Sequence, residues 1–289
     1  MCILSVFLFE TIKQLIIMAV TLEDIKKLRE LTKAGIADCK KALAEANGNM
    51  EEAIKLIRER GQAIAAKRTD RAAEEGCCLS GNEGGFAAIV AVKCETDFVA
   101  NNADFIGMTK DILAAVLKNK PASTDDVLAL SVNGMSVKDL IADRSGVTGE
   151  KMEFGAFESL EGASVASYVH QGNKLCTLVS FKESGVSAEV GKNIAMQIAG
   201  YNPVSIDADS VPADIKQREL EIGMEKARQD GKPENMLERI AQGRLQKFYK
   251  ESTLLAQPFL MDEKITVAEY LKKNNATVVA FKRVNLNQD

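Results

Sequence analysis

Apolar residues recur at helical spacing in three short segments between Thr21 and Gly61. Leu22, Ile25, Leu28 and Leu31 repeat in the first segment, and Ile36, Cys39, Leu43 and Ala46 line the second. In the third segment Met50, Ile54 and Ile57 are predicted to face inward. Thr21 and Asn49 stand where helix caps are expected, because each precedes such a run and an acidic residue follows three positions later. The pattern predicts three short helices around one small core, with the third helix ending at Gly61.

The next segment, residues 62–76, is rich in alanine and basic at its centre, and we predict a linker helix that Gly76 ends. The period then changes to that of a strand over Phe86–Cys94, which follows a glycine-rich stretch suited to a hairpin loop. A connection from Thr96 to Asn102 leads into a helix that ends before Pro121. A short helix is predicted over Val137–Ala142.

A related plan recurs further along the chain. Ser164–Val169 and Leu175–Phe181 read as a second hairpin, and a helix is predicted over Ala188–Ala199. The second hairpin and helix follow the first by roughly 80 to 90 residues, so the sequence predicts a duplicated hairpin-plus-helix module.

The last third of the chain is mostly helical in pattern. Pro212 to Tyr249 is broken only at residues 231–233, which predicts an antiparallel helical hairpin with Ile222 and Met236 among its inward positions. A short helix over Thr266–Asn274 and a strand over Ala276–Phe281 are predicted to follow.

Composition and charge exclude some classes of function but say little about the fold. The chain has 289 residues, with 37 lysines and arginines against 41 aspartates and glutamates, a net charge of -4. Domains that neutralise nucleic-acid phosphates are usually strongly basic, so this balance argues against that role. The chain has six cysteines and no CxxC pair. We therefore predict that the cysteines are reduced, that most of them pack in the interior, and that the protein is intracellular.

Motifs for common catalytic sites are absent from the sequence. Neither phosphate-binding glycine loop occurs, and the single histidine, His170, excludes histidine-based metal sites. A nucleophilic set of Cys94, His170 and Asp97 can be written down, but no spacing places these residues together. Residues 1–17 are apolar without a preceding basic residue, and we expect a non-native or disordered extension before a natural start at Met18.

Asp97 and Phe98 follow the end of the predicted strand, where a fold gains little from a large aromatic residue. One interpretation is a loop aromatic that folds back onto the core. The other is an exposed anchor that enters a groove of a partner, with the carboxylate acting beside it. The residues alone leave both interpretations open.

Several motifs, in this order, resemble those of the bacterial elongation factor Ts family from about Val20 to the end of the chain. They are Asp38-Cys39-Lys40-Lys41-Ala42-Leu43 with Glu45-Ala46-Asn47-Gly48, Thr96-Asp97-Phe98-Val99, Leu160-Glu161-Gly162 followed by Ser167-Tyr168-Val169-His170, Gly231-Lys232-Pro233, and Gln257-Pro258-Phe259.

The resemblance implies an α+β fold with a ubiquitin-associated-like three-helix domain before a core of two related subdomains, each an antiparallel sheet with helices. The implied boundaries are 18–61 for the three-helix domain, 62–76 for the linker helix, 77–160 for subdomain 1, 161–210 with 252–289 for subdomain 2, and 211–251 for an inserted helical hairpin.

The resemblance also implies a guanine-nucleotide exchange factor that binds GDP-bound and nucleotide-free elongation factor Tu. The residues that match the loop disturbing the Mg²⁺ and phosphate site, and its apolar contact, are Thr96, Asp97, Phe98, Val99 and His170. Further partner contacts match Arg29, Ile36, Ala37, Lys40, Arg68, Thr148 and Gly149. Arg68 stands where most relatives have lysine, and Thr148 replaces a more apolar residue.

Such a factor makes no covalent bond, so the resemblance implies no catalytic residue. It also implies no cofactor and no metal ligand. The implied location is the cytoplasm, without direct contact to nucleic acid or membrane. The oligomeric state stays open. The main alternative is a ubiquitin-associated-like adaptor that holds a partner without exchange activity. An enzyme using Cys94 or Cys39, and an RNA-binding translation protein, are further alternatives.

Overall fold

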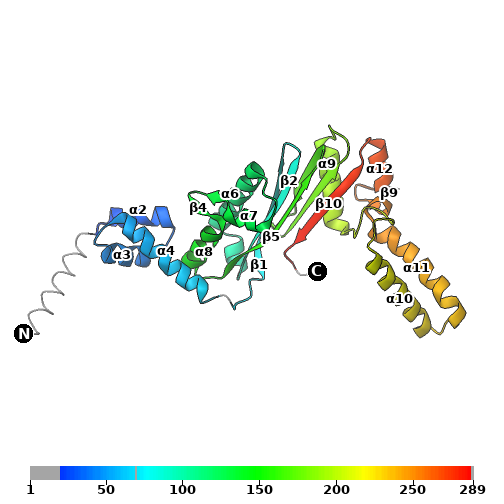
Figure 1. Ribbon diagram of the computed structural model, residues 1–289, viewed down its shortest axis with the longest axis horizontal. Coiled ribbons are helices and arrows are strands. Elements are labelled where there is room, and N and C mark those ends of the chain that lie inside the picture. Colours follow the sequence, from blue (N-terminus) through cyan, green and yellow to red (C-terminus); the bar gives the residue numbers. More distant parts are fainter. Residues whose placement is uncertain (1–19, 69, 288–289) are drawn as a thin grey trace, which may run out of the picture. The chain divides into compact units, whose positions relative to one another are not determined.

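A computed structural model describes residues 20–68 and 70–287 of the chain (Figure 1). Helices combine with antiparallel sheets, so the predicted α+β class is confirmed. The expected extension, residues 1–17, lies outside the described residues. Two compact units share the chain: a first unit of residues up to 76, 92–106 and 125–155, and a second unit of 77–91, 107–124 and those from 156 onward. The domain boundaries expected from the sequence stay predictions.

Three helices open the first unit: α2 (Leu22–Thr32), α3 (Ile36–Glu45) and α4 (Met50–Ala66). Thr21 caps α2, because its hydroxyl donates to the Asp24 carboxylate at 2.6 Å and accepts the Asp24 N–H at 3.1 Å. Asn49 caps α4 by accepting the Glu52 N–H at 3.1 Å. The buried core of these helices consists of Ile25, Leu28, Ala34, Cys39, Ala42, Leu43, Ala46, Ala53 and Ile57.

The prediction that the third helix ends at Gly61, with a separate linker helix over 62–76, is wrong. Helix α4 continues through Gly61 to Ala66, and strand β1 (Glu75–Glu83) already includes Gly76. Gly61 meets Gly146 of helix α8 (Val137–Thr148), and a Cβ at Gly61 would lie 3.3 Å from the Gly146 Cα. This glycine therefore permits two helix backbones to touch and does not stop a helix.

The first sheet has the strand order β1-β2-β5, with β2 at Phe86–Cys94 and β5 at Met152–Glu161. Gly84 and Gly85, both with positive φ, turn β1 into β2. The sequence did not predict β5, because this strand is half-buried at most positions and lacks a run of β-branched residues. Thr96 to Asn102, predicted as a plain connection, contains the one-turn helix α5 (Asp97–Ala100).

Shorter elements complete this part of the chain. They are α6 (Ala103–Asn119), α7 (Thr124–Ala129), β3 (Ser131–Val132) and β4 (Met135–Ser136). Helix α6 ends before Pro121 as predicted, and α8 extends six residues beyond the predicted end at Ala142.

The second sheet has the order β10-β7-β6, with β6 at Ser164–Val169, β7 at Leu175–Phe181 and β10 at Val278–Asn285. The hairpin of β6 and β7 has the predicted bounds, with Val169 opposite Cys176. Helix α9 (Ala188–Tyr201) packs on this sheet through Val190, Ile194 and Ile198. Its Gly191 approaches Ala166 of β6 so closely that an added Cβ would lie 2.6 Å from that side chain.

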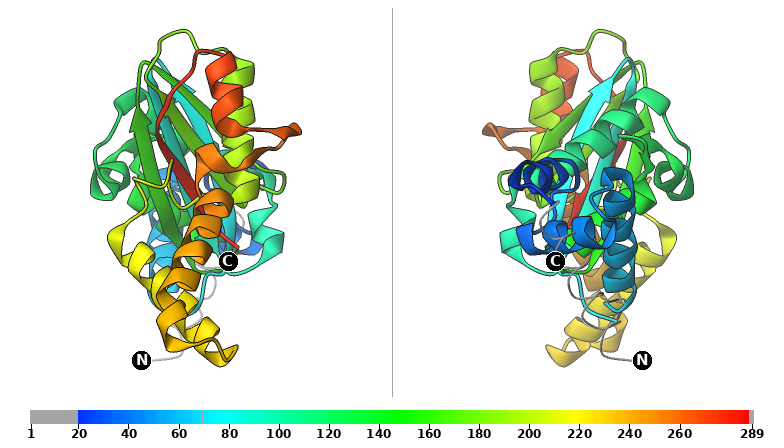
Figure 2. Two further views of the ribbon diagram at one scale, coloured as in Figure 1. Left: turned by 90° about the vertical axis from the view of Figure 1, so that its right-hand side faces the viewer. Right: turned by 90° about the vertical axis from the view of Figure 1, so that its left-hand side faces the viewer.

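Helices α10 (Ala213–Gln229) and α11 (Leu237–Ser252) run side by side as the predicted hairpin, with a short helix η1 (Glu234–Met236) at the turn (Figures 1 and 2). The predicted inward positions Ile222 and Met236 are wrong, since both are exposed. Gly223 lies against Ala241, where an added Cβ would be 3.0 Å from the Ala241 backbone. Small residues therefore bring the two helices close, and the large apolar ones at these positions face outward.

The remaining elements are η2 (Leu254–Ala256), β8 (Pro258–Phe259), β9 (Asp262–Thr266) and α12 (Val267–Lys273). Two buried glutamines join the segment around β8 to α9. Gln257 donates to the carbonyls of Tyr201 at 3.3 Å and Glu251 at 3.0 Å, and accepts from Gln197 at 3.3 Å. Gln197 accepts the Leu260 N–H at 2.7 Å. Among the described residues, no helix is long and apolar enough to cross a membrane.

Replacing Gly146 by alanine is expected to lower the free energy of unfolding by about 1–3 kcal/mol, because its Cβ would overlap the backbone of Gly61. Gly107 of α6 is the matched control, since an added Cβ there meets no atom within 4 Å. Gly107→Ala is expected to stabilise the protein by about 0.5–1 kcal/mol. Urea denaturation measures both; an equal effect of the two variants would refute the close helix contact.

Replacing the buried Gln257 by leucine is expected to cost about 2 kcal/mol, because the carbonyls of Tyr201 and Glu251 lose this side-chain donor and Gln197 loses its acceptor. Gln217→Leu, on the exposed side of α10, should change the free energy of unfolding by less than about 0.5 kcal/mol. Thermal and urea denaturation of the two variants test this difference.

Candidate functional site

The predicted contact residues fall in both units. Twelve residues were predicted: Arg29, Ile36, Ala37, Lys40, Arg68, Thr96, Asp97, Phe98, Val99, Thr148 and Gly149 lie in the first unit, and His170 lies in the second. Within the first unit, side-chain and backbone bonds join the segments that carry Arg68, Thr96 and Thr148. Those bonds run through two glutamates that the sequence analysis did not select.

The loop that follows β2 presents Phe98 to solvent. Thr96 caps the one-turn helix α5 by accepting the Val99 N–H at 3.4 Å, and Asp97 and Phe98 form the first turn. The side chain of Phe98 is 83% exposed, more than any other large apolar side chain among the described residues. The interpretation that Phe98 folds back onto the core is therefore wrong.

Glu95, at the end of β2 and directly before Thr96, gathers three N–H donors. One carboxylate oxygen accepts from the Arg68 guanidinium at 3.0 Å and from the backbone N–H of Lys151 at 2.5 Å. The other accepts from the Arg71 guanidinium at 3.0 Å. The Lys151 ammonium group donates in turn to the Arg71 carbonyl at 2.9 Å.

These bonds hold the pKa of Glu95 at about 2, well below the usual range of a glutamate. The main cause is the backbone N–H of Lys151, followed by the Arg71 and Arg68 side chains, and all of them favour the ionised form against the cost of desolvation. Glu95 is therefore a carboxylate throughout the physiological pH range.

Glu150 holds the residue after Glu95. Its carboxylate accepts the Thr96 hydroxyl at 2.6 Å and the Thr96 N–H at 3.1 Å. Glu150 itself follows Gly149, the left-handed C-cap of α8, and its N–H donates to the Thr148 hydroxyl at 3.3 Å. The predicted contact positions Thr148 and Gly149 are thus bonded to the Phe98 loop through their neighbour.

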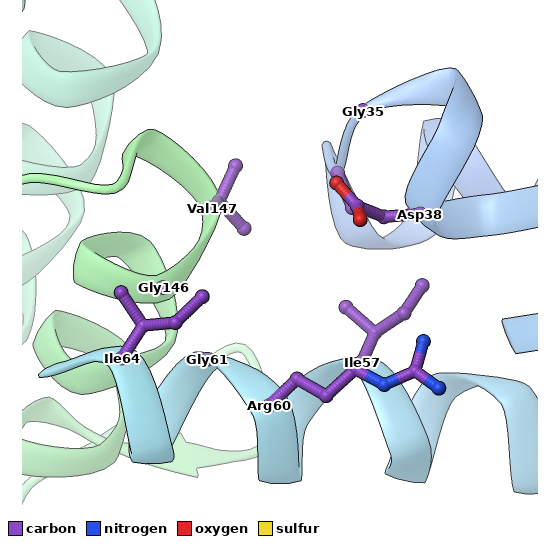
Figure 3. A pocket seen from close by; sticks show the side chains of 9 residues that line it. Gly35, Asp38, Ile57, Arg60, Gly61, Ile64, Gly146 and Val147 are labelled. Carbon is purple, nitrogen blue, oxygen red and sulfur yellow. The ribbon is translucent and has the colours of Figure 1, made fainter. Parts of the chain in front are cut away.

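The predicted contacts on the three-helix bundle are exposed. Ile36 is 58% exposed at the start of α3, with Ala37 and Lys40 exposed beside it. Figure 3 shows a hollow formed by α3, α4 and the end of α8, with Gly35 and Asp38 on its α3 side. It is lined by Ala34, Gly35, Asp38, Ile57, Arg60, Gly61, Ile64, Gly146 and Val147. Arg29 lines a separate shallow depression with Lys26, Glu30, Lys33 and Asp104.

His170 is exposed just after β6. Its Nδ1 atom lies 3.0 Å from the Tyr168 hydroxyl, and the two rings are tilted with centroids 5.9 Å apart. Tyr168 packs against the core of the second unit, so this half-buried side chain orients the imidazole.

The thiols proposed as alternative nucleophiles are inaccessible. Cys39 and Cys94 are fully buried, and the Cys94 thiol donates to the Thr96 carbonyl at 3.3 Å. Burial raises the pKa of Cys39, which disfavours the reactive thiolate. Cys39, Cys77, Cys78, Cys94 and Cys176 form no disulfide, and the described residues contain no group of three or more metal-binding side chains.

Sequence reasoning missed Glu95, Glu150 and Arg71. A lone acid directly after a buried strand is a usable signal for Glu95, because such a residue needs a partner near the strand end. No local signal identifies Glu150, since 54 residues separate it from Thr96.

Comparison with known proteins agrees with the motifs. The family model described as "Elongation factor TS" matches residues 95–288. Elongation factor Ts of Porphyromonas gingivalis is 54% identical over 275 residues, covering 94% of this chain and 100% of the relative. The Azobacteroides pseudotrichonymphae protein of the same name is 49% identical over 274 residues, with coverages of 94% and 100%. That of Amoebophilus asiaticus is 46% identical over 275 residues, with coverages of 92% and 99%.

The match to the family model covers more than half of the chain, and the relatives are matched over nearly their whole length. The motifs that resemble the family all lie within this aligned part or in the helices before it. The chain therefore belongs to the elongation factor Ts family, whose members are nucleotide-exchange factors in translation elongation.

Proposed function

We propose that this protein binds GDP-bound elongation factor Tu and accelerates GDP release by inserting Phe98 beside the Mg²⁺ and phosphate site. The observation that carries the proposal is the 83% exposure of Phe98 on a loop that Glu95 and Glu150 hold in place. Exposure of a large aromatic side chain to water is unfavourable. Burial of that side chain in a partner's groove therefore stabilises the complex.

Insertion of Phe98 between helices of the partner would move the elements that hold Mg²⁺ and the phosphates. Asp97, also exposed, places a carboxylate beside the entering ring. Mg²⁺ needs near-ideal octahedral geometry, so small displacements of its ligands weaken binding of the ion and of the nucleotide with it.

Exchange then follows from linkage. A factor that binds nucleotide-free Tu more tightly than GDP-bound Tu lowers the affinity for GDP by the same ratio. No bond is made or broken in this process, so no residue has to act as a base or nucleophile. Buried Cys39 and Cys94 are consistent with this requirement.

The remaining predicted contacts fit a second area of the same interface. Exposed Arg29, Ile36, Ala37 and Lys40 would let the three-helix bundle, which we propose to be ubiquitin-associated-like, touch the partner together with Thr148 and Gly149. We keep the boundaries 77–160, 161–210 with 252–289, and 211–251 as proposed domains, and the three-helix bundle continues past residue 61 with α4. A role in elongation places the protein in the cytoplasm, with no direct contact to nucleic acid or membrane.

Replacing Phe98 by alanine is expected to slow factor-dependent GDP release on the order of tenfold or more, because the variant loses an anchor of the hot-spot type. Stopped-flow measurement of fluorescent GDP leaving the cognate Tu tests this. Val279→Ala is the matched control, since Val279 is 55% exposed on β10, outside every predicted contact; it should leave release unchanged.

Each outcome of the Phe98 experiment has a distinct meaning. Fast release by the wild type that Phe98→Ala abolishes supports the proposal. Fast release that survives the substitution keeps the exchange function and rejects the loop assignment. Binding of Tu without acceleration of release would identify the protein as an adaptor instead.

His170→Ala is expected to lower the maximal release rate several-fold, and Tyr168→Phe by a smaller factor, because the phenylalanine ring keeps the packing and loses the hydroxyl that orients the imidazole. The same stopped-flow assay measures both variants. A Tyr168→Phe effect larger than that of His170→Ala would contradict an orienting role.

A further inference from the structure

Glu95 and Arg68 form an ion pair with each other, and both side chains are largely shielded from solvent. Their side chains are 16% and 27% exposed, and the guanidinium and carboxylate meet at 3.0 Å. Arg71 adds a second guanidinium at 3.0 Å, with its side chain 57% exposed. Charge-assisted bonds of this kind are stronger than neutral ones, and partial burial reduces their screening by water.

The loop after Glu95 needs such support. Helix α5 has only four residues, and a single helical turn is not stable by itself in water. The bonds that tie the loop to other segments are made upstream of Phe98: Glu95 is bonded on both oxygens, and Thr96 is held through its N–H and hydroxyl by Glu150. The Thr96 carbonyl also accepts from Cys94.

Resting on the exchange activity proposed above, we propose that Glu95 and Arg68 form an internal clamp that positions Phe98 for insertion into Tu. Glu95 is a positioning residue, and Arg68 acts through it instead of contacting the partner. This changes the role that the family resemblance implied for Arg68. Arg68 lies in the segment between α4 and β1, so the clamp ties that segment to the end of β2.

Positioning affects exchange because a loop that is already ordered loses less conformational entropy on insertion. Without the clamp, Phe98 would still be present and exposed, but its starting direction would vary. Loss of the clamp should therefore slow the step in which the ring enters the partner. It should affect the contacts made elsewhere in the interface less.

The test measures two quantities for each variant by stopped flow: the maximal rate of fluorescent GDP release, and the factor concentration that gives half of it. Glu95→Gln keeps the side-chain size and puts an N–H₂ group against guanidinium donors. We expect a maximal rate lowered about tenfold, the effect of losing one bond to a charged group. The half-saturating concentration should change less than about twofold.

The decisive measurement is a set of three double-mutant cycles. Arg68→Ala should add nothing to Glu95→Gln, and neither should add to Phe98→Ala. Arg68→Lys, which keeps the charge near Glu95, should restore most of the wild-type rate. Glu158→Gln is the matched control, because Glu158 is a half-exposed acid that pairs with Lys282 at 2.8 Å in the second unit; it should behave as the wild type.

Contrary results separate the clamp from the function on which it rests. If the wild type does not accelerate release, the proposed function fails, whatever the variants do. If the wild type is active and Arg68→Ala raises the half-saturating concentration by the same factor in the wild-type, Glu95→Gln and Phe98→Ala backgrounds, Arg68 contacts Tu directly and the clamp is rejected. The cycle of Arg68→Ala with Phe98→Ala decides the question even if Glu95→Gln does not fold.

Discussion

Burial of strand β2 is the constraint on which the position of the Phe98 loop depends. From Phe86 to Cys94 only Lys93 is partly exposed, so the strand is fixed on both sides until its last residue. The chain must then leave the interior at once, and the first residue outside is a carboxylate that needs partners. Arg68, Arg71 and the Lys151 N–H supply them. A rigid strand thus ends in a rigid junction, and the exposed aromatic ring follows three residues later.

This arrangement suits a protein that works by binding. In the proposed function, the protein places an apolar group against a folded partner, so that group must neither pack into its own core nor cause aggregation. Phe98 is a single exposed ring flanked by Asp97 and by polar Asn101 and Asn102, which keeps the apolar patch small. Under the proposed function, the free energy for exchange comes from differential binding of two states of the partner, and the loop contributes by holding Phe98 ready to bind.

Local sequence signals predicted the elements that local physics controls. The caps at Thr21 and Asn49, the hairpin of β6 and β7, and the C-terminal end of α6 follow from interactions between residues close in the chain. The predictions were wrong where contacts between distant segments determine a helix end or a strand. Gly61 looks like a helix stop until Gly146 is seen against it, and β5 becomes a strand because it pairs with β2.

The sequence by itself determined the α+β class, most helices and hairpins, and the family, because ordered motifs and periodic burial are written along the chain. Only the tertiary structure decided that Phe98 is exposed, that α4 passes through Gly61, and that Glu95 and Glu150 hold the loop. Those facts depend on pairs such as Thr96 and Glu150, 54 residues apart. The sequence does not show which residue a charged side chain will pair with, because folding brings the two together from distant segments. No periodicity in the sequence carries that information.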